Sequence, residues 1–335
     1  DSGAPRVRLR GPASRWQVDV TISHDAGLAT AAAVVSDVRP PPFLAQPAAL
    51  TLPERPAEGH KGTFGSVSAV AGSYGLTGAA FLCATAAARI GAGTVRLNVA
   101  RTIYPILAVK CTEVMAAPID EVAPGVLGET AAGELTAQLA GARTGLVGPG
   151  LGQDPRTQAL VGQLVAACNH GLVIDADALN ALAADRSRLR GLRPEHVLTP
   201  HPGEMSRLLG EPTPAVQQAR HDRARRAAAE WGAVVVLKGA HTVVAAPDGR
   251  VSEDPHEVPA LGTGGTGDVL GGIVAGLLAQ GLPAYEAAVT GVYVHAAAGR
   301  RLAARQGTLL ASDLLREAPL VVAGLRLVAD GATER

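Results

Sequence analysis

A glycine-rich segment that ends in an acidic residue is the part of the chain best suited to chemistry. It reads Leu-Gly-Thr-Gly-Gly-Thr-Gly-Asp from Leu261 to Asp268, and an apolar run typical of a helix follows from Gly271 to Leu278. Glycines before a helix let backbone N–H groups converge on an anion, and the helix N-terminus adds roughly half a positive charge there. The segment therefore predicts a phosphate-binding loop.

Asp268 gives this loop a second chemical property. A carboxylate beside a phosphate is electrostatically unfavourable unless it accepts a proton from an attacking hydroxyl group or helps to hold a metal ion. The alternative is that Asp268 only caps the helix, because Asp is favoured at helix starts. The loop matches neither the P-loop, which ends in Gly-Lys-Ser/Thr, nor the dinucleotide-binding fingerprint, which follows a strand. A different arrangement for binding phosphate is therefore expected.

Further polar motifs directly follow predicted strands. In Thr-Pro-His-Pro-Gly-Glu, residues 199–204, the prolines stiffen the loop and direct His201 and Glu204 toward a cleft. Glu204 also suits the first turn of a helix, where the helix dipole stabilises it. Lys238 supplies a cation next to Gly239, which permits a sharp backbone turn, although a single Lys at a strand end is usually a solvated charge. All these residues fall in loops, where ligand-binding groups concentrate.

Asp175 and Asp177 follow the predicted strand at residues 172–174. They can pair as metal ligands or as acid and base, and alternation would place both on one face if the strand continued that far. The other interpretation is that they cap the next helix together with Asn180. We retain Asp175 and Asp177 as candidate metal ligands near a phosphate, with Glu204 as a third.

The elements that must position these motifs alternate regularly after residue 50. Short apolar, often β-branched segments predict strands at residues 66–71, 94–99, 144–147, 172–175, 196–198 and 234–237. Ala-rich runs with apolar residues at helical spacing predict helices at 77–89, 129–140, 156–169, 215–231, 267–279 and 285–304. Strand followed by helix, repeated, predicts an α/β fold whose mostly parallel sheet is covered on both faces and binds ligands at the carboxyl ends of its strands.

The composition excludes several classes of protein. Lys plus Arg and Asp plus Glu number 30 each, so no basic excess exists to hold nucleic acid or an anionic membrane. No apolar stretch reaches the roughly 20 residues of a membrane span. The three cysteines, Cys83, Cys111 and Cys168, are widely spaced and lack a CxxC pair. This usage favours reduced, buried thiols and a cytoplasmic protein.

Seven motifs stand in a fixed order along the chain. They are HKGTFG at 60–65, AGS at 71–73 with TGAA at 77–80, GPGLG at 148–152, DADALN at 175–180, TPHPGE at 199–204, LKGAHT at 237–242 and the glycine loop. This set resembles the NAD(P)H-hydrate dehydratase family of the ribokinase-like superfamily, over about residues 50 to 325. The resemblance implies a ribokinase-like three-layer α/β/α sandwich with a mostly parallel central sheet.

The resemblance also implies roles for individual residues. Asp268 would accept the proton of the substrate hydroxyl, while the backbone of Gly265 and Gly267 and a Mg²⁺ ion would stabilise the transferring phosphoryl group. The implied substrate-binding residues are Ala79, Gly150, Gly152, His201 and Asp268. The implied nucleotide-binding residues are Lys238, Gly239, Ala240, His241, Thr242, Gly264, Gly265, Thr266 and Gly267.

The implied reaction repairs NADH or NADPH that carries a hydroxyl group at C6 of the nicotinamide ring. ADP phosphorylates this hydroxyl and phosphate then leaves, which gives NAD(P)H, AMP and phosphate. We expect ADP rather than ATP because the composition looks bacterial. An ATP-dependent small-molecule kinase of the same superfamily and a non-enzymatic NAD-binding sensor are the alternatives. The resemblance further implies a homo-oligomer, a tetramer or larger.

The first 48 residues precede the predicted dehydratase domain, which is expected to span residues 49–328. Pro-rich segments at 40–42 and 53–56 frame this boundary. Residues 1–48 are expected to be either an N-terminal extension that packs on the dehydratase or the closing strands of an NAD(P)H-hydrate epimerase domain. In the second case the epimerase catalytic residues would lie upstream, so no epimerase activity is expected of this chain.

Overall fold

The computed structural model describes residues 16–25, 28–37 and 50–329, which fall into two compact units. One unit contains an antiparallel hairpin of β1 (Trp16–Asp25) and β2 (Leu28–Asp37), and the other spans Gln46–Val321. The start of the chain and the Pro-rich segment at 40–42 lie outside the described residues. The boundary near residue 50 and the origin of residues 1–48 therefore stay predictions.

The larger unit is built on one mixed sheet. Its strands are β3 (Ser66–Val70), β4 (Thr94–Ala100), β5 (Met115–Ile119), β6 (Thr144–Val147), β7 (Gly171–Ile174), β8 (His196–Leu198), β9 (Val234–Leu237), β10 (Val243–Ala245) and β11 (Val251–Glu253). They lie in the order β11-β10-β9-β8-β7-β6-β3-β4-β5. Strands β3 to β9 pair in parallel, and β10 and β11 add an antiparallel edge. The predicted mostly parallel sheet is confirmed.

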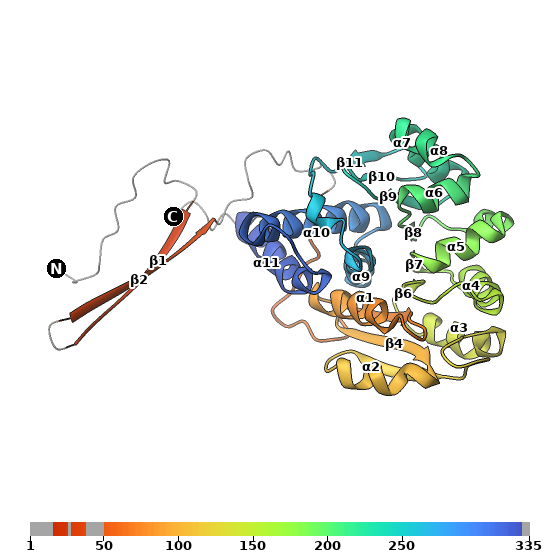
Figure 1. Cartoon of the computed structure of the whole chain (residues 1–335), viewed down its shortest axis with the longest axis horizontal. Coiled ribbons are helices and arrows are strands. Elements are labelled where there is room, and N and C mark those ends of the chain that lie inside the picture. Colours follow the sequence, from red (N-terminus) through yellow and green to blue (C-terminus); the bar gives the residue numbers. More distant parts are fainter. Residues whose placement is uncertain (1–15, 26–27, 38–49, 330–335) are drawn as a thin grey trace. The chain divides into compact units, whose positions relative to one another are not determined.

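Helices cover both faces of this sheet (Figure 1). The α-helices of the described residues are α1 (Thr77–Arg89), α2 (Tyr104–Lys110), α3 (Ala132–Ala140), α4 (Pro155–Ala167), α5 (Asp177–Ala184), α6 (Pro202–Leu209), α7 (Thr213–Gln218), α8 (Arg220–Trp231), α9 (Thr266–Ala279), α10 (Ala284–Gln306) and α11 (Ala311–Ala329). Helices α3 to α8 lie on one side of the sheet, and α1, α9 and α10 lie on the other. The larger unit is thus a three-layer α/β/α sandwich. Among the described residues, no helix has both the length and the apolar character needed to cross a membrane.

The helices differ from the prediction at one place that matters for the site. The predicted helix at residues 215–231 is two helices, α7 and α8, because Ala219 between them takes a non-helical backbone conformation (φ −134°, ψ 46°). The break places Arg220 at the start of α8. The edge strand β5 was not predicted, and it contains Pro118, a residue that sheets tolerate at their edges.

Helix α9 approaches α1 closely because glycines stand at their contact. A Cβ atom added at Gly272 would lie 2.1 Å from the carbonyl oxygen of Cys83, and one at Gly276 would lie 2.7 Å from that of Ala87. Larger residues at either position would push the two helices apart. The glycines after the predicted phosphate loop therefore serve packing, and this packing fixes the position of α9 against the sheet.

A buried histidine of α10 contacts the first turn of α9. Nε2 of His295 donates a hydrogen bond to the carbonyl oxygen of Thr266 over 2.9 Å. Only 8% of His295 is exposed, and burial lowers its pKa to about 4, although the Thr266 carbonyl opposes this shift. The ring is therefore neutral near neutral pH and holds the start of α9 in place.

We expect His295 to make the fold sensitive to acid. Its pKa in the folded chain, about 4, lies below the ordinary value of 6.5, so the unfolded chain binds more protons between these values. The stability linked to this group is complete above pH 6.5 and is lost as the pH falls toward 4. When the pH is lowered from about 7 to 5, the unfolding free energy of the wild type should fall by about 2 kcal/mol more than that of His295→Gln. Urea unfolding at both pH values measures this, and equal losses in both proteins would contradict it.

Candidate functional site

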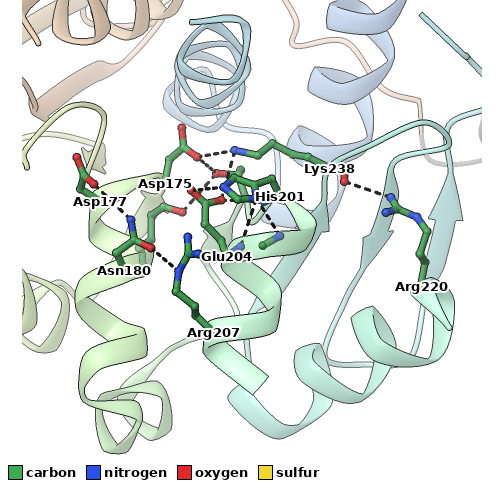
Figure 2. Close-up of polar contacts among 11 residues, drawn as sticks. Asp175, Asp177, Asn180, His201, Glu204, Arg207, Arg220 and Lys238 are labelled. Atoms are coloured by element: carbon green, nitrogen blue, oxygen red, sulfur yellow. Dashed lines mark hydrogen bonds and ion pairs between the residues drawn. The ribbon is translucent and has the colours of Figure 1, made fainter. Parts of the chain in front are cut away.

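Polar side chains gather at the carboxyl edge of three neighbouring parallel strands, β7, β8 and β9. Asp175 directly follows β7, His201 lies in the loop after β8, and Lys238 directly follows β9. Glu204, in the first turn of α6, points to the same place (Figure 2). Residues far apart in the sequence thus meet at the edge where parallel sheets bind ligands.

Asp175 is the buried centre of this cluster. Only 1% of the residue is exposed, and its Oδ1 accepts hydrogen bonds from Thr199 Oγ1 at 2.7 Å and from Lys238 Nζ at 3.0 Å. Its Oδ2 has no hydrogen-bond partner among the described residues. That oxygen lies beside α9, since a Cβ atom at Gly271 would be 3.1 Å from it. Asp175 therefore links the strand edge to the helix that follows the glycine loop.

Lys238 is an internal cation and not a solvated charge. Its side chain is 19% exposed, and Nζ lies 3.8 Å from Glu204 Oε2 as well as 3.0 Å from Asp175 Oδ1. Burial alone would lower the pKa of Lys238, but Asp175 and then Glu204 outweigh it, so that the pKa is raised. Nζ is also 3.4 Å from the position of a Cβ atom at Gly267. A persistent positive charge therefore faces the glycine loop.

His201 and Glu204 cap α6 reciprocally, which confirms the helix-start interpretation of Glu204. Nδ1 of His201 accepts a hydrogen bond from the Gly203 N–H at 2.9 Å, and Glu204 Oε2 accepts one from the His201 N–H at 2.8 Å. Burial, followed by the positive charge of Lys238, lowers the pKa of His201. Burial raises the pKa of Glu204 to about 7, although Lys238 opposes it. A neutral imidazole thus stands 3.4 Å from a carboxyl group that titrates near neutral pH.

The glycine loop gives α9 a start that suits an anion. Gly265 is the N-cap residue, with a φ of 91°, and no side chain caps the helix. In the described chain, the backbone N–H groups of Gly264, Gly265 and Gly267 donate no hydrogen bond to another backbone group. Thr266 Oγ1 donates to the carbonyl oxygen of Leu261 at 2.7 Å, which fixes the shape of the loop. Unpaired N–H groups at a helix N-terminus form an anion-binding arrangement.

Asp268 stands in the first turn of α9 without capping it, because the cap position belongs to Gly265. Burial, then repulsion from Asp175, raises the pKa of Asp268 to about 7, although Lys238 opposes these effects. A carboxyl group that changes charge near neutral pH can exchange protons with a ligand at that pH. The interpretation of Asp268 as a simple helix cap is therefore wrong.

Two segments of small residues meet at the same edge of the sheet. Gly150 has a φ of 65°, and a Cβ atom there would lie only 2.9 Å from the Cβ of Ala79 at the start of α1. Only glycine permits this approach and this backbone conformation. Gly152 is held by a hydrogen bond from its N–H to Asp177 Oδ2 at 2.9 Å. The structure thus brings Ala79 and Gly150 into contact and attaches the end of the second segment to α5.

The carboxylates of Asp175 and Asp177 do not lie on one face of a continued strand. Strand β7 ends before Asp175, and Ala176 then turns the chain with a φ of 50° and a ψ of −116°. The alternation that would place both carboxylates on one face therefore does not extend to Asp177. Asp177 accepts hydrogen bonds from the Gly152 N–H and from Asn180 Nδ2, the latter at 3.3 Å (Figure 2). The expectation of a shared face is wrong. The predicted capping of the next helix is wrong as well, because the N-cap residue of α5 is Ala176 and no side chain caps it, although Asn180 does bind Asp177.

The segment 238–242 is held by Arg220, an arginine that sequence reasoning missed. Its guanidinium donates to the carbonyl oxygen of Lys238 at 3.3 Å (Figure 2). It also donates to the carbonyl oxygen of His241 at 3.4 Å. The chain turns sharply here, since Gly239 has a φ of 148° and His241 a φ of 55°. Nothing in the local sequence distinguishes Arg220 from the other arginines of α8. Only the tertiary structure shows which one supports the segment.

The carboxylates of the site suit a magnesium ion that takes only one or two protein ligands. Among the described residues, no group of three or more His, Cys, Asp or Glu side chains is arranged to hold a metal ion. Mg²⁺ usually needs only one or two carboxylates, together with phosphate oxygens and water. Of the predicted ligands Asp175, Asp177 and Glu204, Asp175 carries the carboxylate oxygen that has no partner. All three stay predictions as metal ligands.

The sheet order, the three layers and the position of the polar cluster define the class of protein. A ribokinase-like superfamily protein (EF1790) from Enterococcus faecalis V583 matches this fold with a TM-score of 0.71 and 27% sequence identity, over 81% of this chain and 90% of that one. The chain thus has a ribokinase-like fold. Within this class, the profile of the NAD(P)H-hydrate dehydratase family matches residues 67–320, and the chain belongs to that family.

Relatives of two lengths match the chain. It is 48% identical over 276 residues to the bifunctional NAD(P)H-hydrate repair enzyme Nnr of Moorella thermoacetica, over 82% of this chain and 52% of that protein. It is 39% identical to the ADP-dependent (S)-NAD(P)H-hydrate dehydratase of Xanthomonas campestris, over 83% of this chain and 94% of that protein. The ADP/ATP-dependent NAD(P)H-hydrate dehydratase of Bacillus subtilis, co-crystallised with ATP and Mg²⁺, matches at a TM-score of 0.67 and 31% identity, over 82% of this chain and 94% of that one. The chain spans about half the length of the bifunctional relatives.

Proposed function

We propose that this chain is an ADP-dependent (S)-NAD(P)H-hydrate dehydratase, which converts hydrated NADH or NADPH to NAD(P)H while ADP becomes AMP and phosphate. One observation carries the proposal. Asp268, a carboxyl group with a pKa near 7, stands beside unpaired glycine-loop N–H groups and faces the internal cation Lys238. A proton acceptor next to an anion site is what phosphoryl transfer to a hydroxyl group requires. Membership of the dehydratase family supplies the substrate class.

In this proposal Asp268 accepts the proton of the C6 hydroxyl group while the oxygen of that hydroxyl attacks the terminal phosphorus of ADP. The P–O bond to AMP breaks, and the N–H groups of Gly265 and Gly267 stabilise the transferring phosphoryl group together with Lys238. The new O–P bond makes the C6 oxygen part of a phosphate ester; the C6–O bond then breaks, phosphate leaves, and loss of a proton from the neighbouring ring carbon restores the dihydropyridine. A carboxylate such as Asp175 would hold a Mg²⁺ ion, which would supply further neutralisation of phosphate charge.

The remaining predicted residues divide between the two ligands. We assign Ala79, Gly150, Gly152 and His201 to the nicotinamide substrate, since small residues let its phosphates approach the backbone. The segment Lys238, Gly239, Ala240, His241 and Thr242 is assigned to the nucleotide together with Gly264, Gly265, Thr266 and Gly267. Arg220 shapes the first segment and Asp177 attaches Gly152, so both act as positioning residues.

Activity should fall in acid because Asp268 must be ionised to accept a proton. Its pKa is raised to about 7, so kcat/KM should fall about tenfold for each pH unit below that value. Glu204 also titrates near 7, and Glu204→Gln tests whether it is the source of the acid limb. We expect the limb to persist in Glu204→Gln. Rates measured between about pH 5 and 9 check this, and a flat profile in the wild type would contradict the assignment of Asp268 as the base.

The proposed activity is tested by mixing NADH hydrate and Mg²⁺ with the full chain and ADP, ATP or no nucleotide. Recovery of the absorbance of reduced nicotinamide with ADP, and none without nucleotide, supports the proposal. Consumption of nucleotide without recovery favours the small-molecule kinase. Binding of the hydrate without any nucleotide turnover favours the NAD-binding sensor.

Further predictions concern the donor, the assembly, the location and the domain boundaries. ADP is the preferred donor, which the names of two relatives support and the ADP/ATP-dependent relative leaves open. A homo-oligomer, tetrameric or larger, and a cytoplasmic location stay predictions. Residues 1–48 stay predicted as an N-terminal extension or the end of an epimerase domain, and residues 49–328 as the dehydratase domain.

A further inference from the structure

A cysteine and two histidines meet at the edge of the sheet opposite to the polar cluster. Cys168 follows α4, His170 precedes β7, and His196 is the first residue of β8. Sγ of Cys168 lies 3.7 Å from Nδ1 and 3.8 Å from Nε2 of His170. The four residues of β7 separate this cluster from Asp175, a distance of roughly 13 Å along an extended strand. The cluster is therefore distinct from the site described above.

The surroundings of His170 favour a positively charged ring. Nδ1 lies 3.1 Å from the carbonyl oxygen of Gly171, and Nε2 lies 3.0 Å from that of Leu139. Carbonyl oxygens only accept hydrogen bonds, and a neutral imidazole carries one N–H group. Both contacts are satisfied only when both nitrogens are protonated. The contact with Cys168, supported by the two carbonyls, accordingly raises the pKa of His170 to about 9.

Cys168 supplies the compensating negative charge. Burial raises the pKa of its thiol, but His170 and then His196 outweigh burial and lower it to about 6. The other two cysteines differ, because burial raises the pKa of Cys83 well above its ordinary value and raises that of Cys111 as well. The thiol of Cys168 is thus ionised at neutral pH. Cys83 and Cys111 serve as internal controls in the same chain.

A buried polar group and a cleft complete the arrangement. His196 is fully buried, it acts on the Cys168 thiol, and neither of its ring nitrogens has a hydrogen-bond partner among the described residues. A small cleft between α3 and α4 is lined by Leu139, Leu164, Cys168 and His170. Only 4% of Cys168 is exposed. Cys168 thus lines a small cleft, and its thiol lies close to a buried imidazole that has no hydrogen-bond partner among the described residues.

We propose that Cys168 is a reactive thiolate that small peroxides, hydrogen peroxide above all, oxidise to a sulfenic acid. The sulfur attacks one peroxide oxygen, an S–O bond forms, and the O–O bond breaks with loss of hydroxide. The imidazolium of His170 gives its proton to this hydroxide, so that water leaves and the imidazole becomes neutral. The sulfur is oxidised by two electrons and the peroxide is reduced by two. Thiolates at partly accessible positions are the cysteines that undergo this oxidation.

The first test measures alkylation of each cysteine in the native full chain by iodoacetamide over a range of pH, with peptide mass spectrometry as the readout. The rate at Cys168 should reach half its maximum near pH 6, whereas Cys83 and Cys111 should still be rising above pH 9, the ordinary thiol value. His170→Gln should move the Cys168 midpoint upward by about two pH units. The pH profile is the readout because the alkylation rate at a single pH would differ little between the wild type and the variant. A thiol with a higher pKa is less ionised, but its thiolate is the better nucleophile.

The second test exposes the native chain to hydrogen peroxide and traps sulfenic acid with dimedone. We expect the adduct at Cys168 before Cys111, although Cys111 is the more exposed residue. Peroxide-free samples and Cys168→Ser are the controls. If His170→Gln unfolds, His196→Asn takes its place, with a smaller upward shift expected. The pH dependence of alkylation in the wild type decides the question without any variant. The proposal is overturned if native Cys168 is not alkylated, or if the midpoint of its pH profile lies at or above the ordinary thiol range.

Discussion

Replacing Asp268 by Asn is expected to lower kcat/KM by roughly a hundred- to ten-thousandfold, the usual value of general-base assistance. The amide has nearly the same shape but cannot accept the proton of the C6 hydroxyl. Stability should be retained or slightly increased, because the carboxylate is buried and repelled by Asp175, and both effects raise its pKa to about 7. Loss of activity without loss of stability therefore identifies a residue that serves the reaction and not the fold.

Asp222→Asn is the matched control for this prediction. Asp222 also stands in the first turn of a helix, α8, but it is exposed and pairs with Arg225 at the surface. This variant should keep wild-type activity. Steady-state rates of NADH-hydrate conversion and urea unfolding of both variants give the comparison. Retention of more than about a tenth of the wild-type kcat/KM by Asp268→Asn would remove this residue from the role of base.

Replacing Lys238 by Met is expected to produce the largest loss of stability, about 3–5 kcal/mol, because it leaves buried carboxylates without their cation. Asp175 is 1% exposed and binds Lys238 Nζ at 3.0 Å, while Glu204 is 5% exposed and lies 3.8 Å from it. The same change removes the positive charge beside Gly267, so ADP should bind more weakly. Urea unfolding measures the first effect and ADP titration the second.

The double variant Asp175→Asn, Lys238→Met separates these two effects. Without the Asp175 charge, much of the lost stability should return, since the remaining amide still accepts the hydrogen bond from Thr199. Binding of ADP should stay weak, because the cation is still missing. A single Lys238→Met variant that is as stable as the wild type would show that the Asp175–Lys238 ion pair does not hold the site together.

Local sequence patterns predicted the centre of the fold better than its edges. Buried parallel strands such as β7 and β9 are uninterrupted apolar runs, and their burial on both faces is what produces that pattern. The edge strand β5 contains Pro118, and β11 is only three partly exposed residues, so neither carries the pattern. Strand order could not be predicted, because the pairing of β6 with β3 depends on packing between segments distant in sequence.

The candidate site was predictable as a set of loops but not as a set of contacts. Glycines, prolines and acidic residues mark the loops, because special backbone conformations and helix starts require them. The pairing of Asp175 with Lys238 joins residues 63 positions apart and leaves no local trace. The turn at Ala176 directs Asp177 away from Asp175, although Ala does not normally indicate a φ of 50°.

The proposed function depends most on the claim that phosphorylation of the hydrate leads to elimination. One reaction tests it: NADH hydrate, ADP and Mg²⁺ with the full chain, in which reduced nicotinamide, AMP and inorganic phosphate are measured over time. We predict that all three increase together in equal amounts. Formation of AMP with neither NADH nor free phosphate would mean that a stable phosphorylated product accumulates, and the chain would then be a kinase.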